Sequence, residues 1–213
     1  MELKNFKAAL FDLDGTLIDT EGQYSVVWHK VGEKYRPDIP NLQEVIKGTT
    51  LKQILAKYFP DPAVQEDVKQ SLDQYESQMN YDFFKGAKEF VLDLKNHGVK
   101  CAIVTSSDRK KMQHACRKNP DLVSLFDRIL TAEDFAASKP DPDPYLKAAA
   151  AFGLPISECI VFEDAYSGLQ SGMASGIYTI GIASYNSRED IEDKCHLVLD
   201  SFEGVTYDNL LDQ

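Results

Sequence analysis

The sequence predicts an α/β protein built on a doubly wound parallel sheet, with a helical domain inserted after the first strand. Short apolar, β-rich runs alternate with amphipathic helical patterns along most of the 213 residues. This alternation is typical of a parallel sheet whose right-handed crossover helices cover both faces. One connection departs from the pattern, because the residues between the first strand and Ala87 contain helical patterns and no convincing strand.

Five runs are predicted to be buried strands, since each is short, apolar and bounded by turn residues. They are Lys7–Asp12, Val99–Thr105, Arg128–Thr131, Cys159–Phe162 and Tyr178–Ile182. Two of the helices between them have clear end signals. The predicted helix Ala87–Asn96 stops before Gly98, which suits a helix C-terminus. The predicted helix Tyr145–Phe152 begins after two prolines and stops before Gly153.

The insert is predicted to contain four helices, at Tyr24–Tyr35, Leu42–Lys47, Leu51–Tyr58 and Ala63–Met79. A structureless loop of this length is uncommon in a compact domain, so we expect a small helical domain here. The expected boundaries are residues 20–83 for the helical domain and residues 1–19 with 84–213 for the core. Trp28 is expected in the interior of the helical domain and His29 on its surface, because an aromatic residue on an amphipathic helix usually packs inward.

The composition is that of an ordinary globular protein, with 43% hydrophobic and 27% charged residues. A formal net charge of −11 argues against a nucleic-acid partner or an anionic membrane surface. No apolar stretch approaches the roughly 20 residues that span a bilayer, and the polar N-terminus does not resemble a signal peptide. The four cysteines form no C-x-x-C pair, so we expect a reduced, cytoplasmic protein without a zinc site or a disulfide framework. We also expect a monomer.

The stretch KAALFDLDGTLIDTEG places two carboxylates, Asp12 and Asp14, directly after the first predicted strand. A carboxylate at the end of a buried strand is costly unless its charge is compensated. The two side chains could shape the turn through hydrogen bonds to the backbone, or they could belong to a cation site. This stretch alone leaves both interpretations open.

Polar residues also follow other predicted strands, and ligands of open parallel sheets bind beyond the carboxyl ends of the strands. The hydroxyl-rich turn 105–107 follows the second strand, Glu163 and Asp164 follow the fourth, and Lys139 lies in the loop ASKPDPDPY. Each feature alone could be a helix cap, a solvated loop or an exposed lysine. Together, four acidic groups at one sheet edge would repel one another without a cation. Oxygen ligands suit Mg²⁺, and a lysine with hydroxyl and N–H donors suits a phosphoryl group.

Four segments, DLDGTLIDTE, VTSSD, SKPDPDPY and VFEDAYSGLQSGMASG, resemble the four ordered motifs of the haloacid dehalogenase-like (HAD) phosphohydrolase superfamily. The resemblance extends over essentially the whole chain. The helical insert is similar to the α-helical cap of the subgroup that includes β-phosphoglucomutase and small sugar-phosphate phosphatases. The resemblance implies a Rossmann-like HAD core and a Mg²⁺-dependent phosphatase of small phosphorylated metabolites, with sugar phosphates as the expected substrates.

The resemblance also implies roles in catalysis and substrate binding. Asp12 would be the nucleophile that becomes an aspartyl-phosphate. Asp14 would protonate the leaving oxygen and later activate the hydrolytic water. Thr105 and the N–H of Ser106 would bind phosphate oxygens, and Lys139 would offset the charge between nucleophile and phosphate. Covalent catalysis would therefore be combined with metal-assisted charge stabilisation.

The same resemblance implies the ligands of the metal ion. Mg²⁺ would be held by the side chains of Asp12 and Asp164 and by the backbone carbonyl of Asp14. Glu163 would lie near the ion, in contact with it directly or through water. The cofactor expected from the sequence is therefore Mg²⁺, and the expected partner is a small phosphorylated substrate.

The cap departs from the β-phosphoglucomutase pattern at two positions. That subgroup has a histidine after the first motif and an arginine after a KG loop, whereas this chain aligns Tyr24 and Leu51 there. Lys52 is adjacent and could partly replace the arginine. These departures favour a phosphatase, and a β-phosphoglucomutase-type phosphotransferase is the alternative.

A third interpretation, from another class, is a signalling domain whose aspartate is merely phosphorylated, as in receiver domains. Asp14 and the long cap argue against it, because such a domain needs neither a leaving-group acid nor a lid. A dehalogenase is disfavoured as well, since carbon–halogen cleavage needs no metal and no second carboxylate at Asp14.

Overall fold

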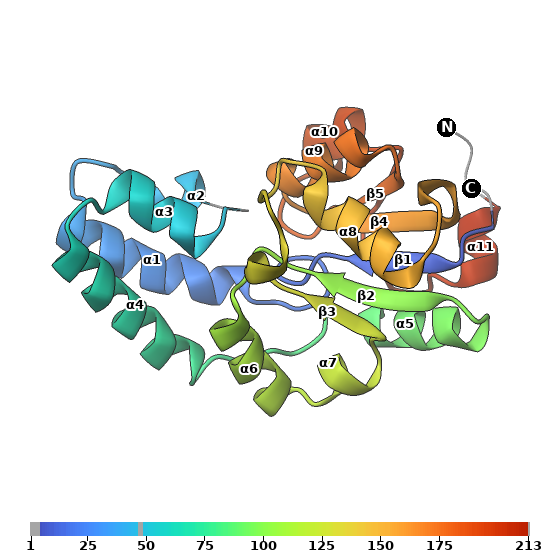
Figure 1. The fold of residues 1–213 in the computed structure, drawn as a ribbon, viewed down its shortest axis with the longest axis horizontal. Helices are drawn as coiled ribbons and strands as arrows, with labels where there is room; N and C mark the ends of the chain where they lie inside the picture. The colour runs from blue at the N-terminus through green and yellow to red at the C-terminus, as the bar shows by residue number, and fades with distance from the viewer. Residues whose placement is uncertain (1–4, 47–48, 213) are drawn as a thin grey trace.

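The strands form one six-stranded sheet in which every neighbouring pair is parallel (Figure 1). This computed structural model describes residues 5–46 and 49–212. The strand order is β3-β2-β1-β4-β5-β6. The strands are β1 (Ala8–Phe11), β2 (Lys100–Val104), β3 (Arg128–Leu130), β4 (Cys159–Glu163), β5 (Tyr178–Ile182) and β6 (Leu197–Leu199). The predicted fold class is confirmed, and the five predicted strands are present. The sequence analysis missed β6, a strand of only three residues.

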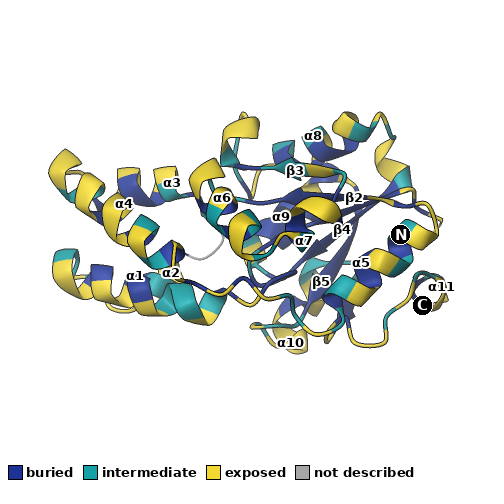
Figure 2. Ribbon diagram, turned by 90° about the horizontal axis from the view of Figure 1, so that it is seen from below, coloured by how far each residue is buried: buried dark blue, intermediate teal, exposed yellow. Residues whose placement is uncertain are grey.

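Both faces of the sheet are buried under helices, so the central strands are apolar at successive positions. In β1, Ala9 and Phe11 belong to one apolar cluster, and Ala8 and Leu10 belong to another on the opposite face. The helix α5 (Ala87–Asn96) packs into the first cluster, and α8 (Asp143–Phe152) packs into the second. Figure 2 shows the buried strands enclosed between helices whose outer faces are exposed. The remaining core helices are α6 (Arg109–Lys118), α7 (Asp121–Ser124), α9 (Tyr166–Ser175), α10 (Arg188–Ile191) and α11 (Tyr207–Leu211).

In the described part of the cap there are four helices, and they extend away from the carboxyl edge of the sheet (Figure 1). They are α1 (Glu21–Tyr35), α2 (Leu42–Val45), α3 (Leu51–Tyr58) and α4 (Pro62–Glu76). The cap has an apolar cluster of its own, in which Trp28 packs near Phe59 with ring centroids 6.4 Å apart. Trp28 is therefore interior and His29 is exposed, as predicted. The KG loop, residues 47–48, lies outside the described residues.

Two linkers join the cap to the core, and they run side by side. The N–H of Asp19 donates to the carbonyl of Asp82 at 3.1 Å, and the N–H of Phe84 donates to the carbonyl of Leu17 at 2.9 Å. These bonds lie close to the predicted domain boundaries, which stay a prediction. Within residues 5–46 and 49–212, no helix combines the length and the apolarity that a membrane span requires.

Gly86 is the position where the second linker enters the core, and we predict that Gly86→Ala is strongly destabilising. Its φ is +83°, and an added Cβ would lie 2.5 Å from the backbone of Phe202. Left-handed backbone alone costs a non-glycine residue about 1 kcal/mol, and the overlap with backbone raises the expected loss in unfolding free energy to about 3 kcal/mol. Thermal or urea unfolding measures it.

Gly98→Ala is the matched control for this experiment. Gly98 has a similar φ of +77°, but an added Cβ would have no neighbour within 4 Å. We expect Gly98→Ala to cost only about 1 kcal/mol. Equal losses in the two variants would contradict the claim that Phe202 requires glycine at position 86.

Candidate active site

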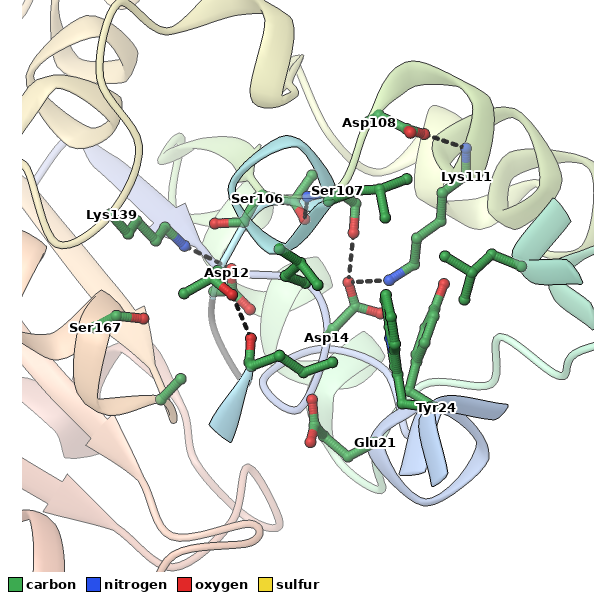
Figure 3. Close-up of a pocket in the computed structure, with 18 of the residues that line it drawn as sticks. Asp12, Asp14, Glu21, Tyr24, Ser106, Ser107, Asp108, Lys111, Lys139 and Ser167 are labelled. Atoms are coloured by element: carbon green, nitrogen blue, oxygen red, sulfur yellow. Dashed lines mark hydrogen bonds and ion pairs between the residues drawn. The ribbon is translucent and has the colours of Figure 1, made fainter. Parts of the chain in front are cut away.

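The predicted site residues converge because three adjacent strands end at the same edge of the sheet. Asp12 follows β1, Thr105 follows β2, and Glu163 ends β4 with Asp164 next in the chain. These strands are neighbours in the order β2-β1-β4. Figure 3 shows Lys139 reaching Asp12 from the neighbouring loop. The structure thus brings together residues that are more than 150 positions apart in the sequence.

Lys139 is the cation at the centre of this edge, and it is almost fully buried. Its Nζ donates to Asp12 Oδ1 at 2.6 Å, to Glu163 Oε1 at 2.7 Å and to the carbonyl of Val104 at 3.0 Å. These contacts occupy the three protons of an ammonium group. Burial would lower the pKa of Lys139, but the Asp12 and Glu163 carboxylates raise it above its usual range, so this side chain stays charged.

Glu163 is held from several directions by protein donors. Its Oε1 also accepts from the Tyr145 hydroxyl at 3.0 Å, and its Oε2 accepts from the N–H groups of Asp164 and Ala165 at 2.9 and 3.0 Å. Gly168 in the first turn of α9 permits this arrangement, because a Cβ there would lie 1.7 Å from Glu163 Oε1. Glu163 is therefore a fixed negative charge that orients Lys139.

Three buried carboxylates lie close enough to share one cation. Asp12, Glu163 and Asp164 each offer an oxygen within 4.8 Å of the others. Asp164 also accepts a hydrogen bond from the Thr16 hydroxyl at 2.7 Å. Burial and the nearby carboxylates raise the pKa of Asp164, and burial raises the pKa of Asp12 to about 8 despite the nearby Lys139. When these three acids are ionised, the single ammonium of Lys139 leaves negative charge that a hard divalent cation would neutralise.

Asp14 has different surroundings, although it lies only two residues from Asp12. Its Oδ1 accepts from the Thr20 hydroxyl at 2.5 Å, and its Oδ2 accepts from the Ser107 hydroxyl at 2.9 Å and pairs with Lys111 Nζ at 2.6 Å. Burial would raise the pKa of Asp14, but Lys111 and the hydrogen bonds hold it below its usual value. The Asp14 carboxylate is outside the three-carboxylate cluster. Any contact with a metal ion there would therefore use its backbone carbonyl.

The cap closes the other side of the cavity over Asp14. Lys111 Nζ lies 4.0 Å from the centre of the Tyr24 ring, and the Tyr24 hydroxyl donates to Glu76 Oε1 at 2.7 Å. Figure 3 shows Lys111 and Tyr24 beside Asp14, on the side away from Lys139. Tyr24, Trp28 and Glu76 line the same cavity as Asp12 and Asp14. Cap and core therefore build this cavity jointly.

The two predicted phosphate-binding residues of the turn also line the cavity. Thr105 and Ser106 both line it, and the Thr105 hydroxyl accepts from the N–H of Ser107 at 3.0 Å. Leu51 lines the cavity as well, whereas the side chain of Lys52 is exposed and is not among the described lining residues. The structure thus gives no support for Lys52 as a replacement for an arginine.

Several residues that surround the predicted site were missed by the sequence analysis. Lys111, Thr20 and Glu76 were not identified, and Ser107 was named only as part of a turn. Lys111 had a usable signal, because it lies in the first turn of α6, where a cation opposes the helix dipole. A lysine at such a position implies an acidic partner elsewhere. Glu76 had no comparable signal, since its partner Tyr24 is 52 residues away.

Comparisons with known proteins agree with this geometry. A family model described as haloacid dehalogenase-like hydrolase matches residues 9–182. A validoxylamine A 7′-phosphate phosphatase from Streptomyces hygroscopicus subsp. limoneus is 29% identical over 93% of this chain and 95% of its own. The chloroplastic protein SUPPRESSOR OF QUENCHING 1 from Arabidopsis thaliana is 31% identical over 87% of this chain, which spans only 19% of that protein.

Two further relatives bear on the subgroup. A solved HAD hydrolase of family IA, variant 3, from Entamoeba histolytica HM-1:IMSS superposes with a TM-score of 0.84 and 30% identity, over 97% of this chain and 98% of the other. A β-phosphoglucomutase from Bacillus subtilis (strain 168) is 25% identical over 83% of each chain.

The fold and the site define a hydrolase of the phosphatase class whose core is a parallel α/β sheet. The chain belongs to the haloacid dehalogenase-like hydrolase family, in its β-phosphoglucomutase-like subgroup.

The buried carboxylates predict how stability depends on pH when divalent cations are removed. The folded pKa of Asp12, about 8, lies above its ordinary value near 4. Between these values the folded protein holds a proton that the unfolded chain releases, so stability falls as the pH rises. The loss is at most about 1.4 kcal/mol per pH unit for one group. We expect the melting temperature in EDTA to fall between pH 5 and pH 8.

Two controls accompany this measurement. Asp12→Asn removes the titrating group, so its melting temperature should depend less steeply on pH. Saturating Mg²⁺ should flatten the wild-type curve, because a bound cation favours the ionised carboxylates in the folded state. A wild-type curve as flat as that of Asp12→Asn in EDTA would contradict the assigned pKa shift.

Proposed function

We propose that this protein is a Mg²⁺-dependent phosphatase that hydrolyses monoesters of small sugars or polyols through an aspartyl-phosphate on Asp12. The observation that carries the proposal is that the two aspartates, Asp12 and Asp14, have different surroundings. Asp12 lies in the buried cluster with Lys139, and Asp14 faces the cap. One carboxylate is thereby placed for the phosphorus atom and the other for the leaving oxygen. The names of the validoxylamine 7′-phosphate phosphatase and of a hexitol phosphatase of Escherichia coli (strain K12) support the substrate class.

The residues present fit a Mg²⁺ ion. The donors are all oxygens, they are buried, and they carry more negative charge than Lys139 compensates. Asp12 and Asp164 would hold the ion with the backbone carbonyl of Asp14. Glu163 would act mainly through Lys139, since protein donors already contact both of its oxygens. When bound, the ion would neutralise charge shared between nucleophile and phosphate.

The first half of the proposed reaction transfers the phosphoryl group to Asp12. Thr105 and the N–H of Ser106 would hold the phosphate oxygens, and Lys139 would offset the charge between nucleophile and phosphate. An oxygen of Asp12 forms a bond to phosphorus while the ester P–O bond breaks, and the leaving oxygen takes a proton from Asp14. Asp14 is ionised in the free protein. The negative charge of a bound phosphate raises the pKa of a neighbouring carboxyl, which allows Asp14 to take up this proton.

The second half returns the enzyme to its starting state. Asp14, now ionised, accepts a proton from a water molecule whose oxygen attacks phosphorus. The bond from phosphorus to Asp12 breaks, and inorganic phosphate leaves. Thr20, Ser107 and Lys111 keep the Asp14 carboxylate oriented through both halves. The monomeric state and the cytoplasmic location expected from the sequence stay predictions.

Substitution of the two aspartates should separate the two halves of the reaction. Asp12→Asn should lower turnover of p-nitrophenyl phosphate by at least about 10³-fold, because an amide is a far weaker nucleophile. Asp14→Asn should still be phosphorylated, since p-nitrophenolate leaves without a proton, but its phosphoenzyme should accumulate. Rapid acid quench and mass spectrometry detect the added phosphoryl group. Turnover of Asp12→Asn within tenfold of the wild type would show that the nucleophile is wrong.

The alternative function is a β-phosphoglucomutase-type phosphotransferase. It is tested because a β-phosphoglucomutase of Bacillus subtilis is among the relatives of this chain. Such an enzyme must bind a second phosphate, and Leu51 cannot replace the bidentate guanidinium of an arginine. Tyr24 cannot exchange a proton near neutral pH, because burial and Glu76 raise its pKa far above that of histidine.

We therefore expect hydrolysis to exceed transfer. The protein is incubated with β-glucose 1-phosphate, a trace of the 1,6-bisphosphate and Mg²⁺, and inorganic phosphate and glucose 6-phosphate are both assayed. Free phosphate should form faster than glucose 6-phosphate. The reverse order would establish the mutase and overturn the phosphatase proposal.

A further inference from the structure

The cap contributes negative charge to the part of the cavity that receives the leaving group. Glu76 at the end of α4 and Glu21 at the start of α1 both line the cavity. Among the described cap residues that line it, none is a lysine, an arginine or a histidine. The other cap residues there are neutral, and Trp28 and Tyr24 offer aromatic surface. The leaving group therefore meets acidic and aromatic side chains.

Glu76 is a fixed part of this surface. The residue is 9% exposed, and its Oε1 accepts the hydrogen bond from the Tyr24 hydroxyl. Its backbone carbonyl accepts from the Tyr81 hydroxyl at 2.9 Å, which holds the end of α4 in place. Burial and the hydrogen bond from Tyr24 keep this carboxylate at the cavity. Its charge therefore acts on whatever occupies the cavity.

The lysines that line the described part of the cavity are already matched with carboxylates. Lys139 pairs with Asp12 and Glu163, and Lys111 pairs with Asp14 at 2.6 Å. Lys111 also lies over the Tyr24 ring, which fixes it between core and cap. Neither described lysine could bind a second anion without giving up such a contact. A carboxylate or a second phosphate on the leaving group would thus face Glu76 without a free counter-charge among the described residues.

We propose that Glu76 is a specificity-determining residue that selects phosphate monoesters whose alcohol part is neutral or carries an ammonium group, and excludes those whose alcohol part is anionic. This inference rests on the proposed function and adds the charge class of the substrate to it. Hydroxyl or ammonium donors can hydrogen-bond to the carboxylate, whereas a buried anion is repelled by it. Tyr24 beside Glu76 and Trp28 in the same cavity suit the apolar face of a polyol or an amino sugar.

The test compares substrates that differ in one group. Sorbitol 6-phosphate and 6-phosphogluconate differ in having a hydroxymethyl or a carboxylate group at C1. Glucose 6-phosphate and glucosamine 6-phosphate differ in having a hydroxyl or an ammonium group at C2. We expect kcat/KM to be at least about tenfold lower for 6-phosphogluconate than for sorbitol 6-phosphate, and no lower for glucosamine 6-phosphate than for glucose 6-phosphate.

Glu76→Gln removes the charge and keeps the shape and an acceptor for Tyr24. It should reduce the discrimination against 6-phosphogluconate to within about threefold, mainly by lowering the KM for that substrate. Glu66→Gln makes the same substitution on an exposed part of α4 and should leave the ratio unchanged. Wild-type protein that hydrolyses both open-chain substrates equally well would overturn the proposal, as would a Glu76→Gln variant that keeps the wild-type ratio.

Binding measurements separate this proposal from the proposed function. The dissociation constants of sorbitol 6-phosphate and 6-phosphogluconate can be measured by calorimetry on the wild-type protein. If neither compound is hydrolysed but sorbitol 6-phosphate binds at least about tenfold more tightly, the phosphatase proposal fails and the charge selection stands. If both are hydrolysed and bind equally well, the charge selection fails and the phosphatase proposal stands.

Discussion

The buried ammonium of Lys139 is the interaction on which the rest of the site depends. It connects the ends of β1, β2 and β4 through Asp12, the carbonyl of Val104 and Glu163. A buried ion pair is favourable only where both charges have further partners, and here Tyr145 and backbone N–H groups complete the coordination of Glu163. The central strands therefore meet at a charged cluster that is incompletely neutralised, and this residual charge makes a cation part of the proposed chemistry.

The sequence predicted the fold because its signals are local. Apolar runs mark the central strands, and a strand-free insert marks the cap. The edge of the sheet that carries the candidate site could also be predicted, since Asp12, Thr105 and Glu163 come directly after or at the end of strands whose carboxyl ends must meet in a parallel sheet. The short β6 was missed because three apolar residues, Leu197–Leu199, give too weak a pattern to identify as a strand.

The surroundings of Asp14 could not be predicted in the same way. They depend on contacts between separate elements, namely α6, the first linker and the end of α4. Lys111 and Glu76 are ordinary helix residues in the sequence. Lys111 reaches the cavity through its ion pair with Asp14, and Glu76 reaches it from α4, which packs against α6. The same two helices make further charged contacts. Asp73 of α4 lies 2.9 Å from Lys110 and 2.8 Å from His114, both on α6. The contact between α4 and α6 thus links the position of the cap to the electrostatics of the candidate site.

The cap has an apolar core separate from those of the sheet, and it joins the rest of the chain through two adjacent linkers. Substitutions inside it can therefore accumulate without disturbing the strand end and the loop that carry Asp12 and Lys139. A lineage of such proteins could acquire new substrates by altering the cap alone, while the reaction itself is inherited unchanged. The same separation makes the helices from Glu21 to Glu76 a natural unit for exchange between relatives, and recombination at the linkers would transfer substrate preference as a single trait.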